Sequence, residues 1–239
     1  MSATINYAEL DYTQWSPVQR WAQHFFKLCS KLLTRTQVEG LENFPIQGPV
    51  LMAVNHLHLF DSPIFFCVVP RRAIIFAADK FKKNWLFNWI LVNVGNVIYV
   101  KRGETDRRTI TDSLKVLRAG GVLAVAPEGT RSRAGSLNKG HTGAVYLASR
   151  APAPIVPMVA YGQEKAYAHW LRLRRAPIYV RIGAPMELPN GKLTVEQLEA
   201  KTEELMVTLA RLLPQEYRGV YAEAAACDDN SNCGRKSAE

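Results

Sequence analysis

The feature that most constrains the fold is an alternation of short apolar runs with amphipathic stretches. The apolar runs have the length of buried strands and end at Gly, Pro or charged residues. They are "GPVLMAVNH", "RRAIIFAADK", a run ending at Val100, "VLAVAP", "PIVPMVAY" and "IYVRIG". Helical patterns separate them, at residues 62–69, 81–91, 105–119, 143–150 and 194–213. Alternation of this kind predicts an α/β fold with a mixed, largely parallel central sheet flanked by helices.

In such sheets the chemistry gathers in loops at strand ends, and "VLMAVNHLHLFDSPIFF" contains one. It places Asn55, His56, His58 and Asp61 between a strand and a helix. Five residues along a continuous helix turn about 140°, so His56 and Asp61 would not share a helical face. With Ser62 as N-cap and Pro63 at the first helical position, Asp61 stays in the turn and can reach back. Its carboxylate would fix one imidazole nitrogen and leave the other as a general base.

Two other interpretations of this turn remain open. In the first, Asp61 only caps the helix and His56 is a hydrogen-bonded core histidine. In the second, His56, His58 and Asp61 bind a metal, as in the H-x-H-x-D-H pattern of binuclear hydrolases. A catalytic metal needs at least three protein ligands, and His24, His141 and His169 stand alone in the sequence. We therefore expect no metal.

A second loop, "VAPEGTRSRAGSLNKG", also follows an apolar strand. Pro127 ends the strand, Gly129 allows a tight turn, and Glu128, Arg131 and Lys139 add charge. The spacing excludes a Walker-type phosphate loop. In "VKRG", Lys101 and Arg102 stand where another strand ends, a pattern that a solvated strand end would also explain.

The net charge of +9 fits either a solvated basic surface or an anionic partner, such as nucleic acid, anionic lipid or a phosphorylated substrate. No nucleic-acid-binding motif is present, so we expect no nucleic acid. Trp and Phe instead cluster beside Lys and Arg, in residues 15–35 and 81–91. The first stretch, with Ser16 as N-cap and Pro17 at the first position, predicts a basic amphipathic helix. It carries too many charges to span a bilayer, and it fits a membrane interface or the protein core equally well.

The chain is expected to form one domain over residues 1–221, followed by a disordered tail at 222–239. The tail is small and polar, without periodic apolar positions. The four cysteines (Cys29, Cys67, Cys227 and Cys233) show no metal-ligand spacing. Without a secretory signal, these features indicate a reducing, intracellular environment.

The two loops resemble a known family. "NHLHLFD" is similar to the N-H-x-x-x-x-D box, and "APEGTRS" to the P-E-G-T-R-S box, of the glycerolipid acyltransferases. The sequence most resembles the bacterial type of 1-acylglycerol-3-phosphate acyltransferase. "GNVIYVKRG" and "IVPM" look like the two supporting boxes, and all four stand in the family order over roughly residues 15–161. One departure is that residues 95–102 are one residue longer than the commonest second box.

The resemblance implies transfer of a fatty acyl group from acyl-CoA or acyl carrier protein to the free hydroxyl of lysophosphatidic acid. The product would be phosphatidic acid, a precursor in phospholipid biosynthesis. His56 would be the base and Asp61 its orienter. The substrate-binding residues would be Glu128, Gly129, Thr130 and Arg131, together with Lys101 and Arg102 at the acceptor's phosphate. Backbone amides near the Glu128–Gly129 turn are candidates for stabilising the oxyanion.

The resemblance implies no cofactor. It also implies monotopic, peripheral association with the cytoplasmic face of the cell membrane, through an N-terminal amphipathic helix at residues 15–35. Several alternatives stay open. The acceptor could be another lysolipid, such as a lyso-ornithine lipid, a lysophospholipid or a glycolipid. Water could be the acceptor of a thioester hydrolase, or the chain could be a non-catalytic lipid-binding protein of the same fold.

Overall fold

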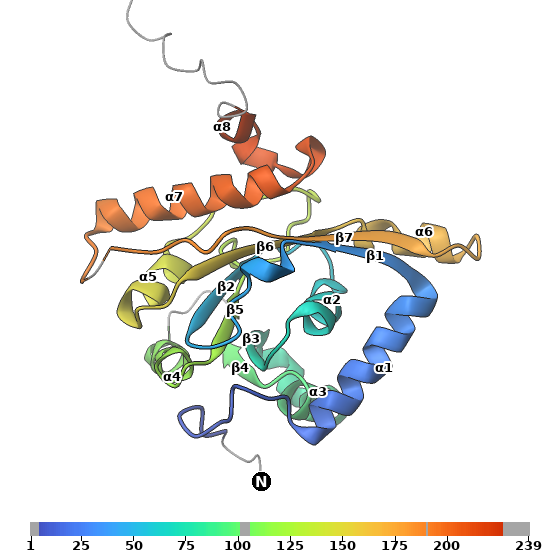
Figure 1. The fold of residues 1–239 in the computed structure, drawn as a ribbon, viewed down its shortest axis with the longest axis horizontal. Coiled ribbons are helices and arrows are strands. Elements are labelled where there is room, and N and C mark those ends of the chain that lie inside the picture. The colour runs from blue at the N-terminus through green and yellow to red at the C-terminus, as the bar shows by residue number, and fades with distance from the viewer. Residues whose placement is uncertain (1–4, 101–105, 190, 227–239) are drawn as a thin grey trace, which may run out of the picture.

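The computed structural model describes residues 5–100, 106–189 and 191–226. The described strands form one seven-stranded sheet in the order β1-β7-β6-β2-β5-β3-β4 (Figure 1). All neighbouring strands are parallel except β6 and β7. The predicted mixed, largely parallel sheet is confirmed. The strands are β1 (Thr34–Glu39), β2 (Val50–Val54), β3 (Ala73–Ala78), β4 (Val97–Val100), β5 (Val122–Val125), β6 (Ile155–Tyr161) and β7 (Ala176–Ile182).

Helices cover both faces of the sheet, as Figure 1 shows for α7 on one side and α2 on the other. One face packs with α4, α5 and α7 in a large apolar core, and the other packs with α2 in a smaller one. The α-helices are α1 (Pro17–Leu33), α2 (Asp61–Val68), α3 (Trp85–Asn93), α4 (Arg107–Arg118), α5 (Gly143–Arg150), α6 (Ala166–Trp170), α7 (Val195–Leu212) and α8 (Ala222–Ala226).

Strand β2 is buried along its whole length, which explains its unbroken apolar sequence. Leu51 and Ala53 belong to the large core, while Val50, Met52 and Val54 belong to the smaller one. The strands β6, β2 and β5 are adjacent and parallel. Their carboxyl ends therefore meet at one edge of the sheet, and the loops after Val54, Val125 and Tyr161 lie together there.

Two boundaries near the N-terminus differ from the prediction. The helix expected over residues 15–35 ends at Leu33, and Thr34–Glu39 forms strand β1. This strand pairs with β7 at the sheet edge. An edge strand needs backbone partners on one side only, so the polar sequence "TRTQVE" gave no apolar run to detect. The short helix α6, between β6 and β7, was also not predicted.

The predicted tail begins too early. Residues Ala222–Ala226 form α8, and Ala225 is buried against the large core. Alanine is the strongest helix former, and the run follows directly on a turn packed against α7. The rest of the predicted tail, 227–239, lies outside the described residues. The helix predicted at 105–119 is found as α4, and Thr105 lies outside the described residues.

Helix α1 begins as predicted, with Ser16 as N-cap in a capping box with Gln19 and Pro17 at the first position. Unlike a helix that packs its apolar face on the core, α1 buries two polar residues, Gln19 and Gln23. Their side-chain amides donate to the carbonyls of Val94 (3.0 Å) and Phe66 (3.1 Å). These bonds fix α1 against the end of α3 and against α2.

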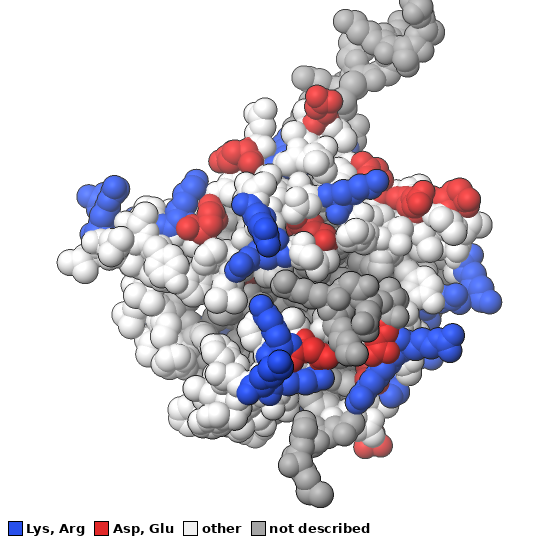
Figure 2. Space-filling view, turned by 180° about the vertical axis from the view of Figure 1, so that it is seen from behind, with Lys and Arg blue, Asp and Glu red and all other residues white. Residues whose placement is uncertain are grey.

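Most of the apolar side chains of α1 face outward, whereas the Phe26 ring packs against that of Phe66 on α2. Trp21 is 79% exposed and Phe25 is 62% exposed, and Leu28 and Leu32 are also exposed. The neighbouring α3 has no buried residue and likewise presents aromatic side chains to the outside. In Figure 2, seen from behind, the side of the molecule where these helices lie is largely free of charged groups, with Lys and Arg at its borders. Among the described residues, no helix combines the length and the apolar character that crossing a bilayer requires.

Candidate active site

The imidazole of His56 and the carboxylate of Asp61 meet at the carboxyl end of β2. The His56 Nδ1 atom lies 2.9 Å from Asp61 Oδ2. Asp61 is the first residue of α2, with Phe60 as its N-cap, so the predicted start at Ser62–Pro63 is wrong. The pair still forms, because His56 lies in the loop before α2. The two residues are therefore not on one continuous helix, which would have turned their side chains apart. Acidic side chains are favoured in the first turn of a helix, so Asp61 suits this position.

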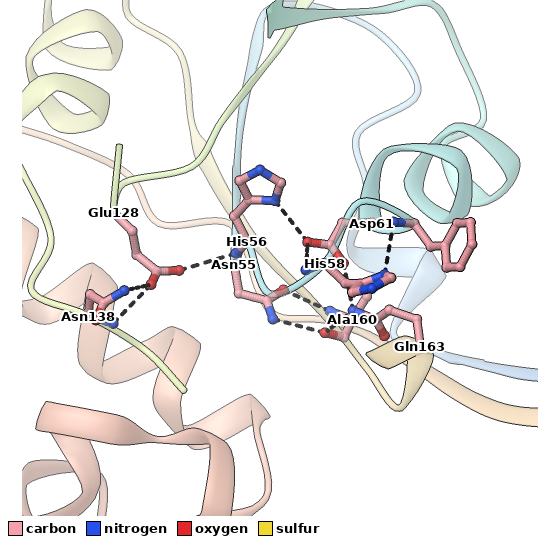
Figure 3. A network of polar contacts seen from close by, with 9 residues as sticks. Asn55, His56, His58, Asp61, Glu128, Asn138, Ala160 and Gln163 are labelled. Atoms are coloured by element: carbon pink, nitrogen blue, oxygen red, sulfur yellow. Dashed lines mark hydrogen bonds and ion pairs between the residues drawn. The ribbon is translucent and has the colours of Figure 1, made fainter. Parts of the chain in front are cut away.

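Asp61 is buried and both of its oxygens accept hydrogen bonds. Oδ2 also accepts the backbone N–H of His58 (2.9 Å), and Oδ1 accepts the side-chain amide of Gln163 (2.7 Å). The His56 side chain is 34% exposed. Figure 3 shows one ring nitrogen facing Asp61 and the other turned away from it. The Asp61 carboxylate is therefore fixed on the protein side, while the outer nitrogen of His56 faces the open side.

Gln163 is a site residue that the sequence did not reveal. It is 1% exposed and lies just after β6, where Gly162 turns the chain at φ 95°. A side chain at residue 162 would meet the Pro177 carbonyl oxygen at 2.5 Å, so the turn requires glycine. Gln163 also donates to the carbonyl of Ala160 (3.2 Å). Asn55 binds both backbone groups of Ala160, each at 2.9 Å, and ties this turn to the His56 loop (Figure 3).

A signal for Gln163 exists in the sequence, although it is weak. The polar residues "GQEK" follow an apolar strand, as the polar residues of the other two loops do. Only the sheet order, with β6 beside β2, brings Gln163 to Asp61.

The Glu128 carboxylate is buried and accepts a hydrogen bond from the backbone of His56. Its Oε1 accepts the His56 N–H (3.2 Å), and its Oε2 accepts the backbone and side-chain N–H groups of Asn138 (2.9 and 3.2 Å; Figure 3). Burial raises the pKa of the Glu128 carboxyl, an effect that these hydrogen bonds oppose. The backbone N–H of Ser132 donates to the His56 carbonyl (2.8 Å). The loop after β5 thus holds His56 through both of its backbone groups.

The next three residues of that loop, Gly129, Thr130 and Arg131, are exposed. Gly129 has φ 69°, a conformation that favours glycine, and its N–H donates to the Ala126 carbonyl (2.9 Å). This amide is therefore occupied within the turn, although amides near it were the expected oxyanion donors. The other predicted cations, Lys101 and Arg102, lie outside the described residues.

His58 belongs to an aromatic cluster. Its ring lies 5.1 Å from that of Phe60 and 6.4 Å from that of Tyr167, between ring centroids. Its Nδ1 accepts the N–H of Phe60 at 3.4 Å. Its side chain packs beside the site, and only its backbone contacts the His56–Asp61 pair.

Two curated relatives with similar sequences are both named as 1-acyl-sn-glycerol-3-phosphate acyltransferases. A 1-acyl-sn-glycerol-3-phosphate acyltransferase of Borreliella burgdorferi is 29% identical over 126 residues, covering 52% of this chain and 50% of that protein. The human 1-acyl-sn-glycerol-3-phosphate acyltransferase alpha is 27% identical over 199 residues, covering 77% of this chain and 67% of that protein. The chain thus spans about half the length of the first relative and about two thirds of the second.

The fold is similar to a crystal structure of the 1-acyl-sn-glycerophosphate (LPA) acyltransferase PlsC from Thermotoga maritima. The TM-score is 0.60 at 24% sequence identity, covering 79% of this chain and 76% of that one. The family model named Acyltransferase matches residues 35–161, more than half of the 239 residues. This match includes the His56 loop, the loop after β5 and the whole of β6. The chain belongs to the acyltransferase family.

Proposed function

We propose that this protein transfers a fatty acyl group from an acyl thioester, acyl-CoA or acyl carrier protein, to the free hydroxyl of 1-acylglycerol-3-phosphate. The product is phosphatidic acid. The observation that carries the proposal is the His56–Asp61 pair, buried on the Asp61 side and open at His56, inside the region that matches the family. The names of the relatives support this choice of acceptor.

In the proposed reaction, His56 Nε2 takes the proton of the acceptor hydroxyl as its oxygen bonds to the thioester carbonyl carbon. The tetrahedral intermediate then expels the thiolate, which receives that proton from the imidazolium. The products are an ester and a free thiol, and the protein returns to its starting state. A positioned general base contributes about 10²–10⁴-fold to the rate. Asp61 holds the ring by its Nδ1–H and stabilises the positive charge that develops on it.

The remaining residues of the network position this pair. Gln163 fixes the second oxygen of Asp61, and Glu128 fixes the backbone of His56. Glu128 therefore acts through His56, although the family resemblance groups it with the substrate-binding residues.

Arg131 is the proposed ligand of the acceptor phosphate. It is exposed in the loop that holds His56, one residue before the Ser132 amide that bonds the His56 carbonyl. A guanidinium can offer two parallel donors to a phosphate. Lys101 and Arg102 remain proposed partners on the basis of sequence alone, as do Gly129 and Thr130 for substrate contact.

The outward apolar faces of α1 and α3 are the proposed membrane contact. Trp21, Phe25 and Leu32 on α1 would enter the interface, and the bordering cations would add attraction to anionic lipid. The face of the membrane, cytoplasmic in this proposal, follows from the expectation of an intracellular chain.

The experiment that tests the function gives purified protein a labelled acyl thioester and a panel of lysolipids, with product identification by mass spectrometry. We expect acylation of 1-acylglycerol-3-phosphate and its loss in folded His56→Ala. Arg131→Ala should raise the KM for this acceptor more than for its phosphate-free analogue. Near wild-type turnover in folded His56→Ala would refute the general-base mechanism. Preference for another lysolipid would refute the choice of acceptor.

A further inference from the structure

The turn that follows α6 exposes two leucines to an unusual degree. Residues 171–175, "LRLRR", are all exposed, and the side chains of Leu171 and Leu173 are 88% and 98% exposed. Neither leucine contributes to a core, so folding in water gains nothing from either of them. We refer to residues 167–175 as the α6 turn.

Leu173 also occupies a position that disfavours leucine. Its φ of 52° lies in the left-handed region. The N–H of Leu173 donates to Trp170 (2.9 Å) and that of Arg174 to His169 (3.0 Å), the bond pattern of a helix end at which glycine is usual. A residue that is both strained and fully exposed calls for an explanation outside the isolated fold.

The α6 turn lies beside both the candidate active site and the outer face of α1. The rings of Tyr167 and Trp170 contact Phe60, at 5.7 and 5.5 Å between centroids, and Phe60 packs on His58. The Trp170 indole N–H donates to the carbonyl of Leu33 at the end of α1 (2.9 Å). In Figure 1, α6 and the end of α1 lie at the same side of the molecule. The exposed leucines of the turn therefore extend the apolar surface that ends at Leu32 and Leu33.

Arginines alternate with these leucines. Arg172 and Arg174 are exposed, whereas Arg175 donates to the Thr34 carbonyl (2.7 Å) and holds the base of the turn. Apolar tips between cations suit an interface with anionic headgroups above acyl chains. We propose that the α6 turn inserts Leu171 and Leu173 into a bilayer containing anionic lipid, beside the loop that carries His56. The choice of a lipid surface as the partner rests on the proposed function.

The test compares the full chain with the double variant Leu171→Ser/Leu173→Gly, and with Ile46→Ser as the control. Ile46 is 73% exposed but precedes β2, at the opposite end of that strand from His56. Glycine at residue 173 relieves the strained backbone, so the melting temperature should equal or exceed that of the unchanged protein. Binding to vesicles of phosphatidylcholine and phosphatidylglycerol should fall at least tenfold, since one leucine side chain suffices for about that factor. Ile46→Ser should bind normally.

A second variant tests the charges. Arg172→Gln/Arg174→Gln should lose about fivefold per arginine on the anionic vesicles and little on pure phosphatidylcholine. Unchanged vesicle binding in either double variant, with the fold intact, would overturn the proposal. An equal loss in Ile46→Ser would do the same.

Vesicle binding is measured without substrate, which separates this proposal from the catalytic one. Loss of binding in the leucine variant supports the α6 turn even if no lysolipid is acylated. When the protein is active, acylation of detergent-dispersed lysolipid should survive in the leucine variant, while acylation in vesicles falls with binding.

Discussion

Two buried carboxylates contact His56 from opposite sides and engage different parts of it. Asp61, on α2, meets the ring, whereas Glu128, in the loop after β5, meets the backbone N–H. Both are nearly inaccessible, at 2% and 3% exposure. The comparison shows that burial and acidity do not define a catalytic residue. The atom that each carboxylate contacts decides whether it can influence a charge forming on the imidazole.

Among the residues that contact His56, the largest effect on turnover is expected for Asp61→Asn, which tests the carboxylate that meets the ring. The asparagine oxygen can still accept from His56 and His58. The Gln163 amide can flip so that its unpartnered Oε1 faces the new NH₂ group, at the cost of its bond to the Ala160 carbonyl. The fold and the ring orientation should therefore persist, while stabilisation of the imidazolium is lost. We expect kcat to fall roughly 10²–10⁴-fold. A fall below tenfold, with an unchanged melting curve, would show that Asp61 only supports the structure.

Gln163→Met sharpens the comparison by leaving both carboxylates in place and removing one donor to Asp61. We expect kcat to fall about tenfold with KM nearly constant, in line with the loss of one hydrogen bond to a charged group. Without that donor, Oδ1 of Asp61 loses its partner, and the carboxylate holds the His56 ring less firmly. Steady-state kinetics of the variant and the unchanged protein would separate kcat from KM. A rise in KM with an unchanged kcat would contradict this positioning role.

Glu128→Gln probes the backbone side and should mainly change stability. We expect a loss of about 1–3 kcal/mol, because an amide NH₂ replaces one acceptor of the His56 or Asn138 donors. Burial raises the pKa of the Glu128 carboxyl above its ordinary value of 4.5. The folded state therefore holds this proton more tightly, and the unchanged protein loses stability as pH rises from 4.5 through the raised pKa.

The glutamine variant lacks this titration. Its stability deficit should therefore be greatest at acidic pH and shrink as pH rises, in denaturant titrations of both proteins. A deficit that grows with pH would show that ionised Glu128 is the stabilised form.

The smallest effect is expected for Asn138→Ala, which leaves its backbone N–H on Glu128 and removes only the side-chain donor. Unfolding free energy should fall by about 1 kcal/mol, and kcat should stay within a few-fold. Differential scanning calorimetry with steady-state kinetics would measure both. A larger loss of kcat than in Asp61→Asn would reverse the comparison.

The central strands and the loops after them were predictable, because β2, β5 and β6 are buried and read as apolar runs. The pairing of His56 with Asp61 was predicted from the loop, although the predicted helix start was two residues too late. The contact of Gln163 with Asp61 was not predictable, because the polar run "GQEK" does not indicate that β6 lies beside β2. Strand β1 was missed because its place at the sheet edge leaves its sequence polar, without an apolar run.

Helices α1 and α7 show the other limit of sequence reasoning. Both begin with a capping box and both are amphipathic, yet α7 buries Leu205 and Leu209 while α1 buries two glutamines. Periodicity locates an apolar face but does not say whether protein or another medium covers it. For α1 the answer required the contacts of Gln19 and Gln23.

The hydrogen bond from Gln23 to the Phe66 carbonyl has a mechanical consequence. Phe66 belongs to α2, the helix that begins with Asp61. In the proposed orientation, the helix resting on the bilayer is joined by this bond, and by the Phe26–Phe66 ring contact, to the helix that carries the partner of the base. The height of the imidazole above the lipid surface is thus set by the protein's own frame. A lysolipid would then meet the base while its chain stays in the leaflet, and no lipid needs to be lifted out of it.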